Sequence, residues 1–144
     1  MEEEKRQHLE FIQNVITRMN TNSFQLKGLA ITIVSALMAI YASNHKLIFI
    51  LIGIPPTILF WFLDSYYLLQ ERKFRGLYND VTGLKQMIDV KLYEMPIKKY
   101  TKKIDKKYSY CNTFFSSTVV WLYFSIVILL CCIILLIKFK NQLL

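Results

Sequence analysis

The stretch "FFSSTVVWLYFSIVILLCCIILLI", residues 114–137, decides the class of this chain of 144 residues. It contains no charged residue, and it is long enough for a helix to cross the hydrocarbon core of a bilayer, which takes about 20 residues. Two further apolar stretches precede it, at residues 24–43 and in "LIFILIGIPPTILFWFL", residues 47–63. Hydrophobic residues make up 54% of the chain, so the sequence predicts an all-α membrane protein with three transmembrane helices.

The three apolar stretches divide the chain into membrane and cytoplasmic segments. The second stretch is expected to continue as a helix beyond the membrane, because the apolar residues between Tyr67 and Ile88 share one arc at 100° per residue. Glu71 and Arg75, four residues apart in the favourable order, support that extension. The expected segments are a cytoplasmic amphipathic helix at 1–23, transmembrane helices at 24–43, 47–69 and 113–138, and a cytoplasmic helical region at 70–112 that includes a basic helix at 97–108.

Lysine and arginine residues are distributed unevenly between the connections. Eleven of them lie between the second and third spans and four lie at or before the start of the first, whereas the connection between the first two spans has only Lys46. Connections rich in lysine and arginine stay on the cytoplasmic side of a membrane. We therefore expect the N-terminus and residues 70–112 in the cytoplasm and the C-terminus outside.

The first expected span carries a stripe of small or weakly polar residues. Gly28, Thr32, Ser35 and Ala39 recur at steps of three and four residues, which places them on one side of a helix. Such a stripe permits close approach of a second helix. It suits packing against the other two spans of the same chain, and the alternatives are an interface with another subunit or the lining of a pore.

The second expected span has two unusual features, a proline pair and an acid. Pro55 and Pro56 remove two backbone donors, which predicts a bent or locally open helix and, as an alternative role, a hinge for gating. Asp64 lies at the cytoplasmic end of the span, where a carboxylate needs a partner, and Lys27 should lie at a similar depth. We expect an Asp64–Lys27 ion pair or a cap by Asp64 on a neighbouring helix, with a structural role in preference to ion selectivity.

The segment "KKYTKKIDKK", residues 98–107, carries lysine doublets spaced four residues apart. On a helix these doublets occupy one half of the circumference, while Tyr100 and Tyr108 lie on the apolar half. Three interpretations remain open: attraction to anionic lipid, binding of an anionic ligand such as a nucleotide or oligonucleotide, and general nucleic-acid binding. The candidate ligand-binding residues are Lys98, Lys99, Lys102, Lys103, Lys106 and Lys107, helped by Arg72 and Arg75.

Sequence signatures of catalysis are missing from the chain. It contains no Gly-rich phosphate loop and no HExxH, GxSxG or CxxC motif. Cys111, Cys131 and Cys132 lack metal-site spacing, and we interpret them as packing residues. His8 and His45 fall on opposite sides of the membrane in the expected topology, and His8 is expected to be solvated or packed. We therefore expect no enzymatic activity, no cofactor and no bound metal.

Two stretches together, "VITRMNTNSFQLKGLAITIVSAL" at 15–37 and "FWFLDSYYLLQERKFRGLYNDV" at 60–81, resemble a group of small bacterial multi-pass membrane proteins. The shared pattern is R-M-x-x-N-S-F-x-x-K-G ahead of one span and F-W-x-L-D-x-Y-Y-L-x-x-E-R-x-F-R-x-L-Y after another. It covers roughly the first 85 residues and leaves out the lysine segment and the third span. The matching positions are Arg18, Met19, Asn22, Ser23, Phe24, Lys27, Gly28, Phe60, Trp61, Leu63, Asp64, Tyr66, Tyr67, Leu68, Glu71, Arg72, Phe74, Arg75, Leu77 and Tyr78.

The arrangement of compact spans joined to a basic cytoplasmic region is also similar to the membrane effectors of bacterial anti-phage systems. In those systems a nucleotide signal made on infection triggers an oligomeric channel or a membrane-disrupting protein. This resemblance implies a homo-oligomeric effector of the bacterial inner membrane that receives an anionic signal at its lysines. The alternative is a membrane anchor or scaffold that recruits a soluble partner protein through the apolar face of Phe74, Leu77 and Val81, with the lysines held to lipid.

Overall fold

Helices account for the regular structure of this chain in the computed structural model, which describes residues 2–143. No β-strand occurs among these residues, and α1, α2 and α4 are each long and apolar enough to cross a membrane, so the predicted all-helical class is confirmed. The elements are α1 (Glu2–Asn44), α2 (Ile48–Thr82), the short 3-10 helices η1 (Ile97–Lys99) and η2 (Lys106–Tyr108), α3 (Tyr110–Phe114) and α4 (Ser117–Leu143).

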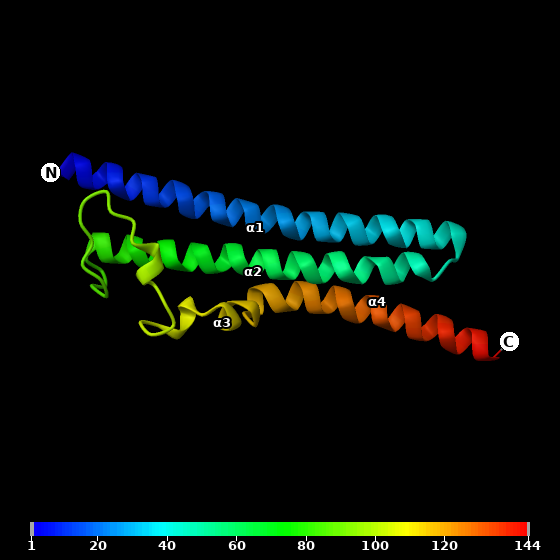
Figure 1. Ribbon diagram of the computed structural model, residues 1–144. Helices are drawn as coiled ribbons and strands as arrows, with labels where there is room; N and C mark the ends of the chain where they lie inside the picture. The colour runs from blue at the N-terminus through cyan, green and yellow to red at the C-terminus, as the bar shows by residue number, and fades with distance from the viewer. Residues whose placement is uncertain (1, 144) are drawn as a thin grey trace.

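Helices α1 and α2 form a long antiparallel pair that is the frame of the molecule. Figure 1 shows them side by side, joined by the short turn at residues 45–47, with α4 along the half of α2 next to that turn. In this apolar half the three helices share a core. Each helix contributes one buried residue to it: Val34 from α1, Ile50 from α2 and Leu130 from α4. The opposite half of the α1–α2 pair projects beyond α4 and is covered by the segment between α2 and α3.

The segment between Thr82 and Tyr110 differs from the sequence prediction. A basic helix at 97–108 was expected within a helical region at 70–112, but α2 ends at Thr82 and only the two 3-10 turns follow before α3. Gly83 ends α2 in the left-handed conformation, with φ of 81°. Adjacent lysine doublets also repel each other at helical i,i+4 spacing, which removes support from a helix there.

Three of the four apolar side chains of this segment nevertheless pack on its inner side as predicted, whereas Ile104 is exposed. Tyr100 and Tyr108 are buried, and they form one core with Ile12 of α1 and Leu77 of α2. Their rings meet edge to face with centroids 5.4 Å apart. The segment therefore gains its order from two tyrosines packed against the α1–α2 pair, and the lysines between them lie on its outer side.

The tyrosine packing depends on Gly76 of α2. A Cβ atom at this position would overlap Oη of Tyr108 and lie 3.0 Å from Cε1 of Tyr100. Both rings are buried, so neither can give way without opening the core. Gly76 is thus needed for close approach of the basic segment to the helix.

We predict that Gly76→Ala loosens the basic segment while leaving the long helices intact. Overpacking of a well-packed core costs about 1–3 kcal/mol. The measurement is the rate of trypsin cleavage within residues 98–107 of the purified protein, which should rise. Gly53→Ala is the matched control in the same helix, because a Cβ there would make ordinary 3.6 Å contacts with Leu37 and Leu130. Equal cleavage rates in the two variants would contradict the prediction.

Candidate functional site

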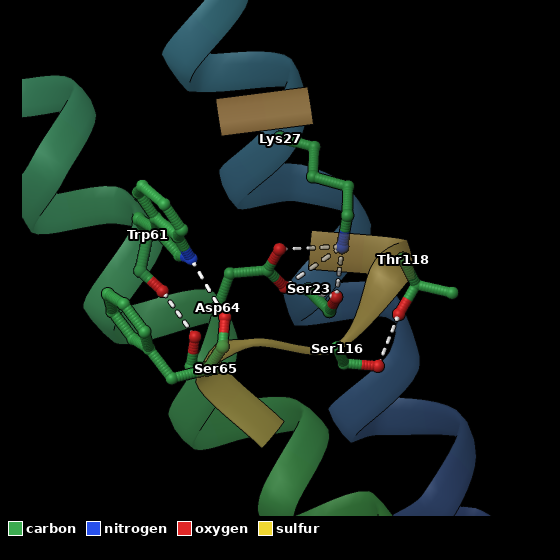
Figure 2. Close-up of polar contacts among 8 residues, drawn as sticks. Ser23, Lys27, Trp61, Asp64, Ser65, Ser116 and Thr118 are labelled. Carbon is green, nitrogen blue, oxygen red and sulfur yellow. Dashed lines mark hydrogen bonds and ion pairs between the residues drawn. The ribbon is translucent and has the colours of Figure 1, made fainter. Parts of the chain in front are cut away.

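A buried ion pair joins α1 and α2 at the border between the apolar and the projecting halves. The Lys27 ammonium lies 2.8 Å from Oδ2 and 2.9 Å from Oδ1 of Asp64, which confirms the predicted pair. The Asp64 side chain is fully buried, and that of Lys27 is 26% exposed. Figure 2 shows the Lys27 ammonium directed at the carboxylate from the neighbouring helix.

Ser23 completes this cluster, and sequence reasoning missed it. Its hydroxyl donates to Oδ1 of Asp64 and accepts a 2.6 Å hydrogen bond from the Lys27 ammonium. The Lys27 ammonium thus donates to Ser23 and to Oδ1 of Asp64 and lies at ion-pair distance from Oδ2, which suits a structural role for the cluster. Ser23 lies four residues before Lys27, so helical spacing was the signal that could have found it.

The entry into α4 docks onto α2 next to this cluster. The Trp61 indole stacks on Phe114 at 4.7 Å and donates to the Phe114 carbonyl at 3.2 Å. About three turns further along α2, Arg72 donates to the hydroxyl of Ser116 at 2.8 Å and to that of Thr113 at 3.4 Å. Arg72 was predicted to bind a ligand, but the structure uses it to hold the start of α4.

The lysine segment is held to α2 by a buried hydrogen bond. The Tyr100 hydroxyl donates to Oδ2 of Asp80 at 2.6 Å. Burial raises the pKa of Tyr100 above its ordinary value, and this hydrogen bond raises it further. At the other end, Asp105 accepts from the backbone N–H of Lys107 at 3.0 Å and so caps η2, which lowers the pKa of Asp105. Both ends of the segment are therefore fixed by named contacts.

The predicted lysines of this segment differ in their ion pairing. Lys99 lies 3.7 Å from Glu94, and Lys107 lies 3.4 Å from Asp105. Within residues 2–143 the other four form no ion pair, and their side chains lie on the surface. Two of them line a shallow hollow of about 780 Å³ together with Thr101. The unpaired lysines are Lys98, Lys102, Lys103 and Lys106.

The remaining predicted positions occupy different places. Gly28, Thr32, Ser35 and Ala39 are exposed on α1, so packing of this stripe against the other spans of the chain is wrong. Arg75 pairs with Glu71 at 2.7 Å, as predicted.

Two other predictions for α2 also differ from the structure. Pro55 and Pro56 lie inside the unbroken helix, so a locally open helix is wrong and the bend stays a prediction. The face proposed for a soluble partner is covered, because Leu77 is fully buried and Phe74 and Val81 pack in the same core. That face therefore cannot recruit a partner while the basic segment is in place.

His8 clamps the segment after α2 onto the first turns of α1. It is 1% exposed, and its Nδ1 accepts from the backbone N–H of Tyr93 at 3.4 Å. Tyr93 has φ of 61°, which is strained for a residue with a side chain, and its hydroxyl donates to Gln7 at 2.7 Å. Burial lowers the pKa of His8, and the nearby backbone of Glu94 offsets this only in part.

Comparison of the chain with models of protein families, with curated proteins and with solved structures finds no match in any of the three.

Breaking the buried ion pair should destabilise the protein. Asp64→Asn leaves the Lys27 charge without its counter-charge, and loss of one partner of a buried pair costs about 3–5 kcal/mol. The midpoint of thermal unfolding in detergent measures the effect. Arg6→Met is the control, because it breaks an exposed pair with Glu3 and should cost less than about 1 kcal/mol. The double variant Lys27→Met, Asp64→Leu should recover much of the loss. A small effect of Asp64→Asn would show that the pair does not hold the helices together.

The His8 clamp should loosen in acid. Because the folded state lowers the pKa of His8 below 6.5, the unfolded segment binds more protons as the pH falls through that value. The clamp is therefore stable above about pH 6.5 and loses stability from there down to the lowered pKa. Hydrogen exchange of residues 84–94, corrected for intrinsic rates, should accelerate in this window. His8→Phe should abolish the pH dependence, and His45→Gln should keep it.

Proposed function

We propose that this chain is a non-enzymatic, homo-oligomeric effector of the bacterial inner membrane. It acts as a channel or disrupts the membrane when an anionic nucleotide or oligonucleotide binds its basic segment. The observation that carries the proposal is the set of unpaired lysines on the 97–108 segment, which two buried tyrosines fix to α2. The same helix continues unbroken into the apolar half that contains Pro55 and Pro56, so a force on the segment reaches the membrane.

The position of the segment along α2 favours a soluble ligand over lipid. The apolar part of α1 begins at Phe24, level with the Ser23–Asp64 contact, so Asp64 marks the expected edge of the hydrocarbon. Gly76, where both tyrosines dock, lies about 18 Å further along the helix at 1.5 Å per residue. The headgroup layer is only about 5–8 Å deep, and attraction to its charge falls off over a Debye length of about 8 Å. Most of the lysines then lie beyond the distance at which the anionic headgroups attract them most strongly.

The exposed stripe on α1 supports assembly of several copies. Gly28, Thr32, Ser35 and Ala39 contact none of the other helices closely enough to be buried, although small residues of this kind allow helices to approach each other in lipid. Packing of the stripes from neighbouring copies would bring their basic segments around one axis. The repeated positive charge would then attract an anionic ligand more strongly than a single copy can.

The alternative of a scaffold that recruits a soluble protein has less support. Its proposed apolar face is already covered by Tyr100 and Tyr108. The role in anti-phage defence comes from the architectural resemblance of compact spans to a basic cytoplasmic region, and it is part of the proposal. The topology proposed here places the N-terminus and residues 70–112 in the cytoplasm and the C-terminus outside.

Reconstitution tests this function directly. Liposomes containing the protein should release a trapped dye or ions when cyclic dinucleotides, cyclic trinucleotides or a short oligoadenylate are added, with an affinity that falls as salt rises. Reversing three unpaired lysines, Lys102→Glu, Lys103→Glu and Lys106→Glu, should abolish the response, because the ligand then meets repulsion.

The matched control reverses three exposed basic residues away from the segment, Arg6, Arg18 and Lys46. This variant has the same net charge and should still respond. Vesicles that stay impermeable with every one of these nucleotides would refute the channel function. A response that survives reversal of Lys102, Lys103 and Lys106 would remove the basic segment as its receptor.

A further inference from the structure

A cleft of about 690 Å³ lies in the projecting half of the molecule, apart from the ion-pair cluster and from the lysines at 98–107. Its walls come from the first turns of α1, the last turn of α2 and residues 86–92. Buried His8 and Asp80 form its floor, and exposed Lys5 and Lys91 lie at its mouth. A volume of this size is typical of sites for small molecules.

The floor of the cleft contains a buried donor that lacks an acceptor. Nδ1 of His8 accepts from Tyr93, so a neutral ring carries its proton on Nε2. Nε2 has no hydrogen-bond partner among the described residues. Asp80 is the buried acid among the lining residues, but its two oxygens already accept from the Met87 N–H at 3.0 Å and the Tyr100 hydroxyl at 2.6 Å. The backbone of Glu94 lies near His8 and partly offsets the lowering of its pKa by burial, but Nε2 forms no hydrogen bond within the described residues, so an acceptor from outside the chain can pair with it.

The other lining residues define the chemistry of that acceptor. Lys5 and Lys91 favour a negative charge, and the two carboxylates of the lining, Asp80 on the floor and Asp89 at the exposed mouth, restrict where that charge can lie. The remaining wall is mostly apolar and suits a hydrocarbon or aromatic body. It consists of Val81, Met87, Ile88, Val90 and Leu92, with the amide of Gln86.

We propose that this cleft binds a small organic anion. Its carboxylate or phosphate accepts from Nε2–H of His8 between Lys5 and Lys91, and its apolar body lies against the wall of residues 86–92. The proposal concerns a different site from the basic segment and does not depend on channel activity. The two sites are joined through Asp80, because this one carboxylate holds Met87 in the wall of the cleft and Tyr100 under the lysines.

Histidine NMR tests the proposal, because the chain has only two histidines and His45 lies in the turn between α1 and α2, at the other end of that pair. The full chain, labelled with ¹⁵N histidine in lipid nanodiscs, is titrated with 4-fluorobenzoate and separately with 4-fluorophenyl phosphate. Each ¹⁹F signal also reports binding against empty nanodiscs. We expect saturable binding that shifts the ring resonances of His8 and leaves those of His45 in place. The stronger of the two probes identifies whether the site prefers carboxylate or phosphate.

Variants separate the cleft from other anion sites. His8→Phe keeps a ring of similar size but removes the donor, so it should weaken binding of the anion about tenfold. In the parent protein, the neutral probe 4-fluorobenzyl alcohol should bind about tenfold more weakly than the anion. Val90→Trp fills the cleft and keeps His8, so it should abolish binding while the His8 signals persist. Lys5→Glu with Lys91→Glu should weaken binding, whereas the control Lys102→Glu with Lys103→Glu should not. The proposal is overturned if His8 does not shift, or if Val90→Trp binds like the parent protein.

Discussion

The arrangement of this molecule depends on one buried ion pair, in which neither charge can be left without its partner. The fully buried Asp64 carboxylate meets the Lys27 ammonium in surroundings where either charge alone would be costly. Since each group lies on a different long helix, this contact determines the register of α1 against α2. The register in turn decides which residues of α2 face α1 some 18 Å further along, where Ile12 and Leu77 meet under the two tyrosines.

The molecule is consequently organised as two halves with different surfaces on one pair of helices. Towards the turn, the core consists of aliphatic residues from three helices, and the outside is apolar, with exposed side chains such as Trp121 and Leu135. On the other side of the ion pair, the third helix is replaced by an irregular segment whose order depends on single contacts of Tyr93, Tyr100 and Tyr108. Met87, Ile88, Val90 and Ile97 of the segment pack around the same core, and since the segment contains no α-helix, these side-chain contacts hold its backbone in place.

Sequence patterns were sufficient for features that depend only on a long apolar run or on two opposite charges at helical spacing. Long uncharged runs predicted the three helices, and helical spacing predicted the Glu71–Arg75 pair. They were insufficient where tertiary packing competes with local spacing. The lysine doublets fit a helix, yet burying both Tyr100 and Tyr108 against Gly76 requires a chain that turns between them. Likewise, spacing placed Gly28 and Ala39 on one stripe but could not say whether another helix of the chain covers it, because that depends on where α4 packs.

The unbroken course of α1 has a mechanical consequence. A helix of 43 residues is about 65 Å long, and roughly half of it projects beyond the ion pair. In a bilayer, helices tilt to match the thickness of the hydrocarbon. A change in tilt of about 5° in the apolar half would displace the first turn of α1 by about 3 Å, as a lever does. His8 and Gln7 lie in that part of the helix and bind Tyr93. A change in membrane thickness would therefore strain these two hydrogen bonds.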